Sequence, residues 1–169
     1  ATTFLDPEVR ESLHKFLDKD IANPSSVHTF GQEARALLAS ARRSIATFFS
    51  VRPHEIVFSS GGSEALNMII RGVFDLNPAG HIITSDLEHA AVYSTCKSLE
   101  NKGCETTFLS PGTLGAVTPK MLEEALRPDT KLIVLMAVNN ETGVKTDIES
   151  MAKIAQEANI PFVVDAIAL

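Results

Sequence analysis

The feature that most constrains the fold of this chain is a repeated alternation between short apolar runs and helix-like segments. The apolar runs are Glu55–Phe58, His81–Thr84, Thr106–Leu109, Lys131–Met136 and Phe162–Val164. Several of them are continuously apolar rather than alternating in polarity. That pattern is typical of strands that are buried on both faces of a parallel sheet.

Helical periodicity fills the intervals between these runs. Apolar residues recur with a 3.6-residue period over 31–49, and the same period follows Gly62. Further helices are predicted over 91–99, from Thr118-Pro119 onward and over 148–155, and Asp6-Pro7 predicts an earlier helix start. Repeated strand–helix units predict an α/β fold with a mainly parallel sheet and helices on both of its faces.

Composition excludes several classes of protein. The 169 residues include 15 Lys+Arg and 21 Asp+Glu, a net charge of −6, which argues against a nucleic-acid surface but not against a local anion site. No apolar run approaches the ~20 residues of a membrane span, and the first residues do not resemble a signal peptide. Cys96 and Cys104 lack disulfide-framework or metal-ligand spacing, so we expect reduced thiols in a cytoplasmic protein.

Polar residues follow four of the apolar runs. In an open α/β sheet, ligands bind just beyond the carboxyl ends of the strands. The residues found there are Ser59–Glu64, Ser85–His89, Asn139–Gly143 and Asp165. We therefore expect these segments to converge on one site.

The segment Ser59–Glu64 enters a helix through two glycines. Backbone N–H groups in the first helical turn, including those of Gly62 and Ser63, could bind a phosphate at the positive end of the helix dipole. The alternative is an ordinary turn capped by Ser60 or Ser63. The segment lacks both G-x-x-x-x-G-K-[ST] and G-x-G-x-x-G, so a Walker loop or a dinucleotide fold is a poor fit.

The remaining strand ends carry an imidazole, a carboxylate and two amides. His89 lies at a helix start and could stack on an aromatic ligand, or it could simply be a surface histidine. Asp165 ends an apolar strand, where a carboxylate requires a cation or a protonated ring nitrogen. Asn139 and Asn140 could offer amide contacts or build the turn before Gly143.

Two other kinds of site fit these residues less well. Asp86, Glu88 and His89 could bind a metal ion, but no second histidine is well placed, so we expect no metal site. A serine hydrolase lacks its main signal, because the chain has no G-x-S-x-G elbow.

Taken in order, the segments resemble motifs of the cysteine desulfurase and selenocysteine lyase family (NifS-like), which has the class-V aminotransferase fold. Each match is modest alone, but the ordered set is highly specific. The matching residues are Ala1–Thr3, Asn23–His28 with Gly31, Glu55–Glu64 with Asn67, His81–Ser85 with Glu88–His89, Asn139–Gly143, and Val164–Ala166.

The resemblance implies the large domain of a fold-type I pyridoxal-phosphate enzyme, incomplete at its C-terminus. Residues 1–30 would form an N-terminal segment with the start of a family motif and the N-P-S-S loop. Residues 31–169 would form a partial cofactor-binding large domain.

The resemblance also implies pyridoxal 5'-phosphate as cofactor. By position, Gly62 and Ser63 would bind its phosphate, and Asp165 would pair with the protonated ring nitrogen. His89 would stack on the ring and assist proton transfers as a catalytic residue. Asn140 would contact the cofactor or the substrate.

The family reaction removes sulfur (or selenium) from cysteine (or selenocysteine) and leaves alanine, with a cysteine persulfide intermediate. The resemblance therefore implies a cysteine-like substrate bound by Asn23 and Asn140. It further implies a homodimer, a sulfur-acceptor protein and a place in iron–sulfur cluster assembly.

The chain departs from the family pattern at important positions. Ala168 stands where relatives have a Gln that contacts the ring hydroxyl. The Schiff-base lysine and the catalytic cysteine of the family lie further along than Leu169, and neither Cys96 nor Cys104 inherits the cysteine's role. We therefore expect the 169 residues alone to be inactive.

Two alternatives remain beside the desulfurase interpretation. One is a degenerate non-catalytic remnant or binding module of the same fold, favoured by Ala168. The other is a different class-V enzyme, such as an aminotransferase or a kynureninase-like lyase. The segments Asn23–His28 and Asn139–Gly143 argue against the second.

Overall fold

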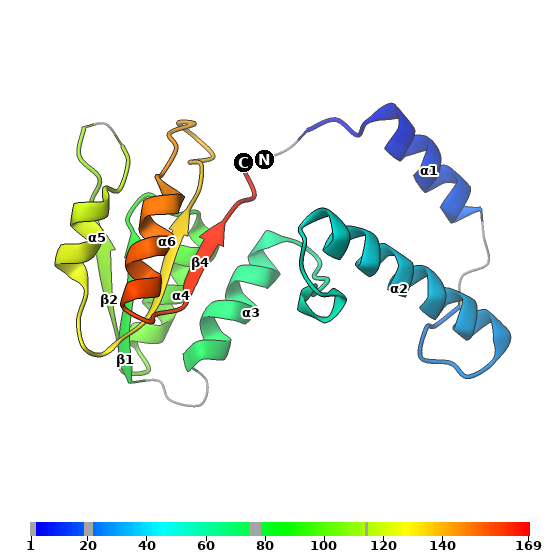
Figure 1. Cartoon of the computed structure of the whole chain (residues 1–169), viewed down its shortest axis with the longest axis horizontal. Coiled ribbons are helices and arrows are strands. Elements are labelled where there is room, and N and C mark those ends of the chain that lie inside the picture. The colour runs from blue at the N-terminus through cyan, green and yellow to red at the C-terminus, as the bar shows by residue number, and fades with distance from the viewer. Residues whose placement is uncertain (1–2, 19–21, 75–78, 114) are drawn as a thin grey trace. The chain divides into compact units, whose positions relative to one another are not determined.

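The computed structural model describes residues 3–18, 22–74, 79–113 and 115–169 (Figure 1). Contacts divide the chain into two compact units, an N-terminal unit that ends at Phe58 and a sheet unit over Ser59–Leu169. Ala1 and Thr2, which belong to the first family motif, lie outside the described residues. The functional division into residues 1–30 and 31–169 stays a prediction, because a division of the chain by contacts does not test which segments bind the cofactor.

Two helices and a short 3₁₀ turn make up the N-terminal unit. They are α1 (Pro7–Leu17), α2 (Thr29–Phe48) and η1 (Pro53–Glu55). Asp6 caps α1, since its carboxylate accepts the Glu8 N–H at 2.8 Å, and Pro7 takes the first helical position. Both predicted helices of this unit are confirmed.

The strand predicted at Glu55–Phe58 is wrong. Glu55 ends η1, and none of the described residues pairs with this run in a ladder. The carbonyl of Ile56 instead accepts a hydrogen bond from Arg42 Nε at 3.3 Å, and the Val57 side chain is 66% exposed. An apolar run becomes a strand only where a neighbouring backbone satisfies its N–H and C=O groups, and sequence pattern alone does not reveal that neighbour.

A four-stranded parallel sheet organises the other unit, in the order β2-β1-β3-β4. The strands are β1 (Gly80–Ser85), β2 (Cys104–Leu109), β3 (Thr130–Met136) and β4 (Phe162–Asp165). Four of the five predicted strands are therefore confirmed. The two central strands are almost entirely buried, as their continuous apolar runs predicted.

Helices cover both faces of this sheet, also as predicted (Figure 1). They are α3 (Gly62–Phe74), α4 (Ala90–Glu100), α5 (Pro119–Ala125) and α6 (Ile148–Glu157). One core packs α3 and α4 against the side chains of Ile82 and Leu132, and the other packs α5 and α6 against Ile83 and Ile133. Adjacent strand residues thus point to opposite cores, as the pleat requires.

The carboxyl ends of the parallel strands all lie at one edge of the sheet, and three of the four polar segments singled out above lie at or after strand ends: Ser85–His89, Asn139–Gly143 and Asp165. The fourth, Ser59–Glu64, follows no strand and leads into α3. No helix within the described ranges is both long enough and apolar enough to cross a bilayer.

Candidate active site

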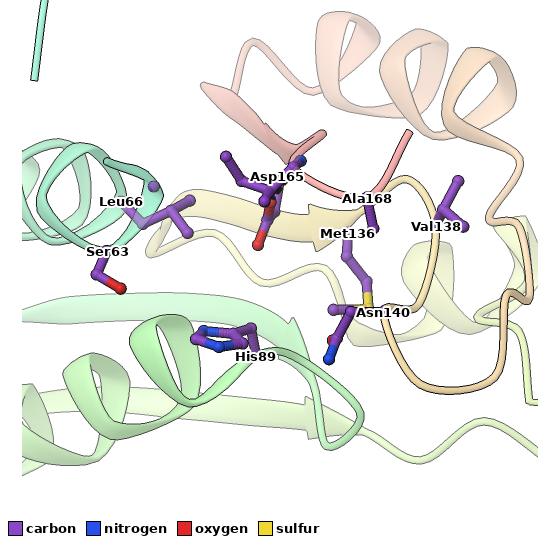
Figure 2. A pocket seen from close by; sticks show the side chains of 10 residues that line it. Ser63, Leu66, His89, Met136, Val138, Asn140, Asp165 and Ala168 are labelled. Carbon is purple, nitrogen blue, oxygen red and sulfur yellow. Dashed lines mark hydrogen bonds between the residues drawn. The ribbon is translucent and has the colours of Figure 1, made fainter. Parts of the chain in front are cut away.

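A pocket of about 220 Å³ lies at the carboxyl ends of β3 and β4, beside the start of α3 (Figure 2). The residues that line it are Gly62, Ser63, Leu66, His89, Met136, Val138, Asn140, Asp165, Ile167 and Ala168. The structure therefore brings together five of the six residues that sequence analysis assigned to the site. The sixth, Asn23, lies in the N-terminal unit, where its Oδ1 accepts the Ser25 N–H at 2.9 Å.

Helix α3 presents its N-terminus to this pocket. The first helical hydrogen bond runs from Ala65 N–H to the Gly61 carbonyl, so the N–H groups of Gly62 and Ser63 find no acceptor within the described residues. Neither the Ser60 nor the Ser63 hydroxyl accepts an N–H of the first turn within the described residues; Ser60 instead hydrogen-bonds the Glu64 carboxylate through its own N–H at 2.5 Å and through its side chain, which lowers the pKa of Glu64. The turn capped by a serine is therefore not what forms. Free N–H groups at the positive end of a helix dipole favour an anion.

Gly62 lies close to the side chain of Ile167, in the chain that follows β4. A Cβ built on Gly62 would lie 2.8 Å from the Ile167 side chain, whereas one on Gly61 would meet nothing within 4 Å. Ile167 lines the same pocket. The second glycine therefore lets the wall formed by residues after β4 come against the start of α3.

Asp165 ends β4 and is only 7% exposed. One carboxylate oxygen accepts the Ile167 N–H at 3.0 Å, and no cationic side chain of the described residues pairs with it. A buried carboxylate without a cation is costly. Because its side chain lines the pocket, a protonated ring nitrogen bound there would supply the missing positive partner.

His89 lies on the opposite side of the pocket from the Asp165 carboxyl (Figure 2). Its Nδ1 caps α4 by accepting the Ala91 N–H at 3.1 Å. An accepting Nδ1 carries no proton, so the neutral ring carries its N–H at Nε2. The cap holds one edge of the imidazole and leaves the rest of the ring free to contact a ligand.

The two neighbouring asparagines have different roles. Asn139 is buried and builds the turn: its Oδ1 accepts the N–H groups of Glu141 and Thr142 at 3.0 and 2.8 Å, and its Nδ2 donates to the Leu87 carbonyl at 3.0 Å. Asn140 is exposed, lines the pocket and makes no hydrogen bond within the described residues. Both possibilities were open for this pair in the sequence: Asn139 builds the turn, and the amide contact predicted for Asn140 stays a prediction.

Glu88 does not line this pocket but contacts it through Met136, and the sequence indicated no role for it beyond the metal ligand that we did not expect. Its side chain is buried, and Oε1 accepts hydrogen bonds from Ser85 Oγ at 2.7 Å and from the Met136 N–H at 3.1 Å. Burial, with a smaller contribution from Asp165, raises the pKa of Glu88 to about 7. The sequence signal that could have identified Glu88 is its position, three residues after Ser85 at the end of β1 and directly before His89.

Neither a lysine nor a cysteine of the described residues lines this pocket. Cys96 and Cys104 are buried, and burial raises the pKa of the Cys96 thiol to about 12 and of the Cys104 thiol to about 11. Thiols that remain protonated at neutral pH are poor nucleophiles. Ala168 offers the pocket only a methyl group.

A family model, curated relatives and solved structures each match nearly the whole of this chain. The class-V aminotransferase family matches residues 1–169. Cysteine desulfurase IscS of Dictyoglomus turgidum is 46% identical over 169 residues, which are 99% of this chain and 43% of the relative. Among solved structures, a NifS-like protein has a TM-score of 0.94 at 33% identity and covers 99% of this chain and 47% of its own.

A second solved structure, SspA in complex with cysteine, has a TM-score of 0.91 at 38% identity and covers 96% of this chain and 47% of its own. The chain thus spans less than half the length of the curated relatives it matches.

Proposed function

The chain belongs to the class-V aminotransferase family, and from this premise we propose that it supplies the cofactor-binding part of a pyridoxal-phosphate-dependent cysteine desulfurase. One observation carries the proposal. A single pocket combines N–H groups at the start of α3 and the carboxylate of Asp165, which have no acceptor and no cationic partner among the described residues, with the imidazole of His89 on the opposite side.

These three groups fit the three parts of pyridoxal 5'-phosphate. The N–H groups of Gly62 and Ser63 would bind the phosphate, which is the anion that a helix N-terminus prefers. Asp165 would hold the proton on the ring nitrogen, since a buried carboxylate favours a cationic partner. His89 would lie against the ring and could hold or release a proton at Nε2.

When bound, the cofactor supplies a protonated ring that takes up the electron pair released from an amino-acid substrate. The protein's contribution is orientation and electrostatics. Asp165 keeps the ring nitrogen charged, the cap at Ala91 fixes the His89 ring, and the Asn139 turn presents the Asn140 amide to the pocket. Asn140 would contact the substrate from this pocket, and Asn23 stays a predicted substrate-binding residue of the N-terminal unit.

The proposed substrate is cysteine or a cysteine-like amino acid, as the names of the relatives support. The overall reaction transfers sulfur from free cysteine to a protein thiol, so that cysteine and the thiol give alanine and a persulfide. The described residues supply neither an exposed thiol nor a lysine at the pocket. Both groups would come from elsewhere in the holoenzyme, and the 169 residues alone would not turn over.

The proposal extends to partners and compartment. It includes a homodimer, a sulfur-acceptor protein, a cytoplasmic location and a role in iron–sulfur cluster assembly. The functional boundaries at residues 1–30 and 31–169 belong to the same proposal. Selenocysteine, which would release selenium in place of sulfur, is the alternative substrate.

Equilibrium binding of pyridoxal 5'-phosphate to Asp165→Asn tests the cofactor assignment. A charge-assisted hydrogen bond contributes about 1.5–3 kcal/mol, so we expect the dissociation constant to rise about 10- to 150-fold. Glu124→Gln, the same carboxyl-to-amide change on the exposed face of α5, should leave the affinity unchanged. Equal affinities for Asp165→Asn and wild type would contradict the assignment.

Product analysis of the holoenzyme with L-cysteine tests the reaction. We expect alanine and protein-bound sulfur in equal amounts. Pyruvate and ammonia in place of alanine would instead indicate another class-V lyase. Tight cofactor binding without turnover would favour the non-catalytic module, which is the alternative that Ala168 supports.

A further inference from the structure

Glu88 stands out among the buried titratable groups because it touches three parts of the site at once. It follows the end of β1, it precedes His89, and its Oε1 accepts the N–H of Met136, the last residue of β3. The same oxygen accepts the Ser85 hydroxyl at 2.7 Å. One carboxyl oxygen therefore joins the ends of two central strands to the loop that carries His89.

The second oxygen of Glu88 has a different environment. Oε2 is buried and has no hydrogen-bond partner among the described residues. A carboxylate would leave charge on that oxygen without a donor, whereas a carboxylic acid leaves an uncharged O–H there and Oε1 free to accept; burying an unpaired O–H costs less than burying an unpaired charge.

Of the titratable groups around Glu88, His89 alone is of a type that can carry a positive charge. Asp165 faces it from β4 and Cys96 faces it from α4, while Asp86 and His89 flank it on its own loop. Burial and the Asp165 carboxylate raise the pKa of Glu88 to about 7. At neutral pH and below, much of the group is therefore protonated.

We propose that Glu88 is a positioning residue of the cofactor site, whose neutral carboxyl group ties the ends of β1 and β3 to the loop carrying His89 and so holds the imidazole across the pocket from Asp165. The identity of the ligand in this inference rests on the proposed function. The positioning of His89 by Glu88 does not, because it involves only residues of this chain.

Two substitutions separate the neutral-acid role from a charged role. Glu88→Gln keeps the accepting oxygen and places an uncharged donor at Oε2, so it imitates the neutral acid. Glu88→Ala removes the acceptor and leaves the Met136 N–H and the Ser85 hydroxyl without it. Glu124→Gln on α5 is the control for the chemical change itself.

The first measurement is binding of pyridoxal 5'-phosphate at pH 6. We expect Glu88→Gln to stay within about threefold of wild type and Glu88→Ala to bind about tenfold or more weakly, because the Met136 N–H and the Ser85 hydroxyl lose the acceptor that holds the His89 loop in place. Equal weakening in both variants would overturn the neutral-acid role.

The second measurement follows His89 without any ligand. The Ala91 amide donates to His89 Nδ1, so its NMR chemical shift reports the position of the ring. Glu88→Gln should keep the wild-type Ala91 shift and Glu88→Ala should change it. An unchanged shift in Glu88→Ala would show that Glu88 does not position His89, even if wild-type protein failed to bind the cofactor.

The third measurement is a carbon-13 NMR titration of the side-chain carboxyls in wild-type protein, with Glu88 assigned by its loss in Glu88→Gln. We expect a midpoint near 7, moved lower in Asp165→Asn. A midpoint below about pH 5 would overturn the proposal. This arm remains decisive if Glu88→Ala fails to fold, and failure of cofactor binding alone would count against the proposed function only.

Discussion

Ala168 is the residue at which the pocket departs most directly from the pattern of the family that the chain resembles. The Gln expected there would donate to the ring hydroxyl of the cofactor, whereas the methyl group of Ala168 only lines the wall. This difference can be predicted from the sequence, because it concerns the residue type at one position of a motif. It could not assign Glu88, because the role of that side chain depends on a burial and a hydrogen bond to Met136 that arise only in the fold.

Introducing the missing amide should strengthen cofactor binding. We expect Ala168→Gln to lower the dissociation constant for pyridoxal 5'-phosphate about 2- to 10-fold, since one added hydrogen bond contributes about 0.5–1.5 kcal/mol. Ala166→Gln, at an exposed position two residues earlier, is the matched control. Equal affinities for the two variants would mean that the pocket wall at Ala168 does not face the cofactor.

At the scale of elements, local signals predicted most of the structure. Capping residues and proline positions located the helix starts at Asp6-Pro7 and Thr118-Pro119, and continuous apolar runs located the four strands. The run Glu55–Phe58 failed because strand formation depends on a partner, which is non-local information. The pair Asn139 and Asn140 could not be divided from sequence for a similar reason, since the turn decides which amide faces the pocket.

The loop before α2 gives a prediction at this scale. A Cβ on Gly31 would meet the carbonyl oxygen of Ser26. This oxygen belongs to the backbone, so it cannot move aside as the end of a flexible side chain could. We expect Gly31→Ala to destabilise the N-terminal unit by about 1–3 kcal/mol, measured by urea unfolding followed with circular dichroism.

Gly72 in α3 provides the opposite control. A Cβ there meets nothing within 4 Å, and Ala is the better helix former, so Gly72→Ala should stabilise its helix by about 0.5–1 kcal/mol. If Gly31→Ala were as stable as Gly72→Ala, the close packing of the Asn23–His28 loop against the start of α2 would be refuted.

At the scale of the whole molecule, two buried groups give opposite dependences of stability on pH. His81 is buried between the hydroxyls of Thr130 and Thr107, each 2.8 Å from a ring nitrogen, and burial lowers its pKa below 6.5. Below that pH the unfolded chain binds a proton that the folded chain does not, so stability falls as the pH falls. Glu88 has a raised pKa, so the folded chain keeps a proton that the unfolded chain loses above about 4.5, and stability falls as the pH rises toward 7.

Removing one of these two groups should therefore leave the pH dependence of stability that the other group causes. Between pH 5 and 6.5 we expect the unfolding free energy of Glu88→Gln to rise with pH, and that of His81→Gln to fall with pH, while wild type is flatter than both. The contribution of Glu88 is at most about 3 kcal/mol over its full range. Urea unfolding at several pH values measures these slopes, and parallel profiles for wild type and Glu88→Gln would contradict the buried neutral acid.

We expect one pocket at the carboxyl ends of the strands to bind pyridoxal 5'-phosphate, and a crystal structure of the protein with this cofactor would show whether it does. The phosphate should lie on the N–H groups of Gly62 and Ser63, the ring nitrogen on Asp165, and the ring against His89. Cofactor bound at any other place, or a folded protein whose pocket stays empty at saturating cofactor, would refute this assignment.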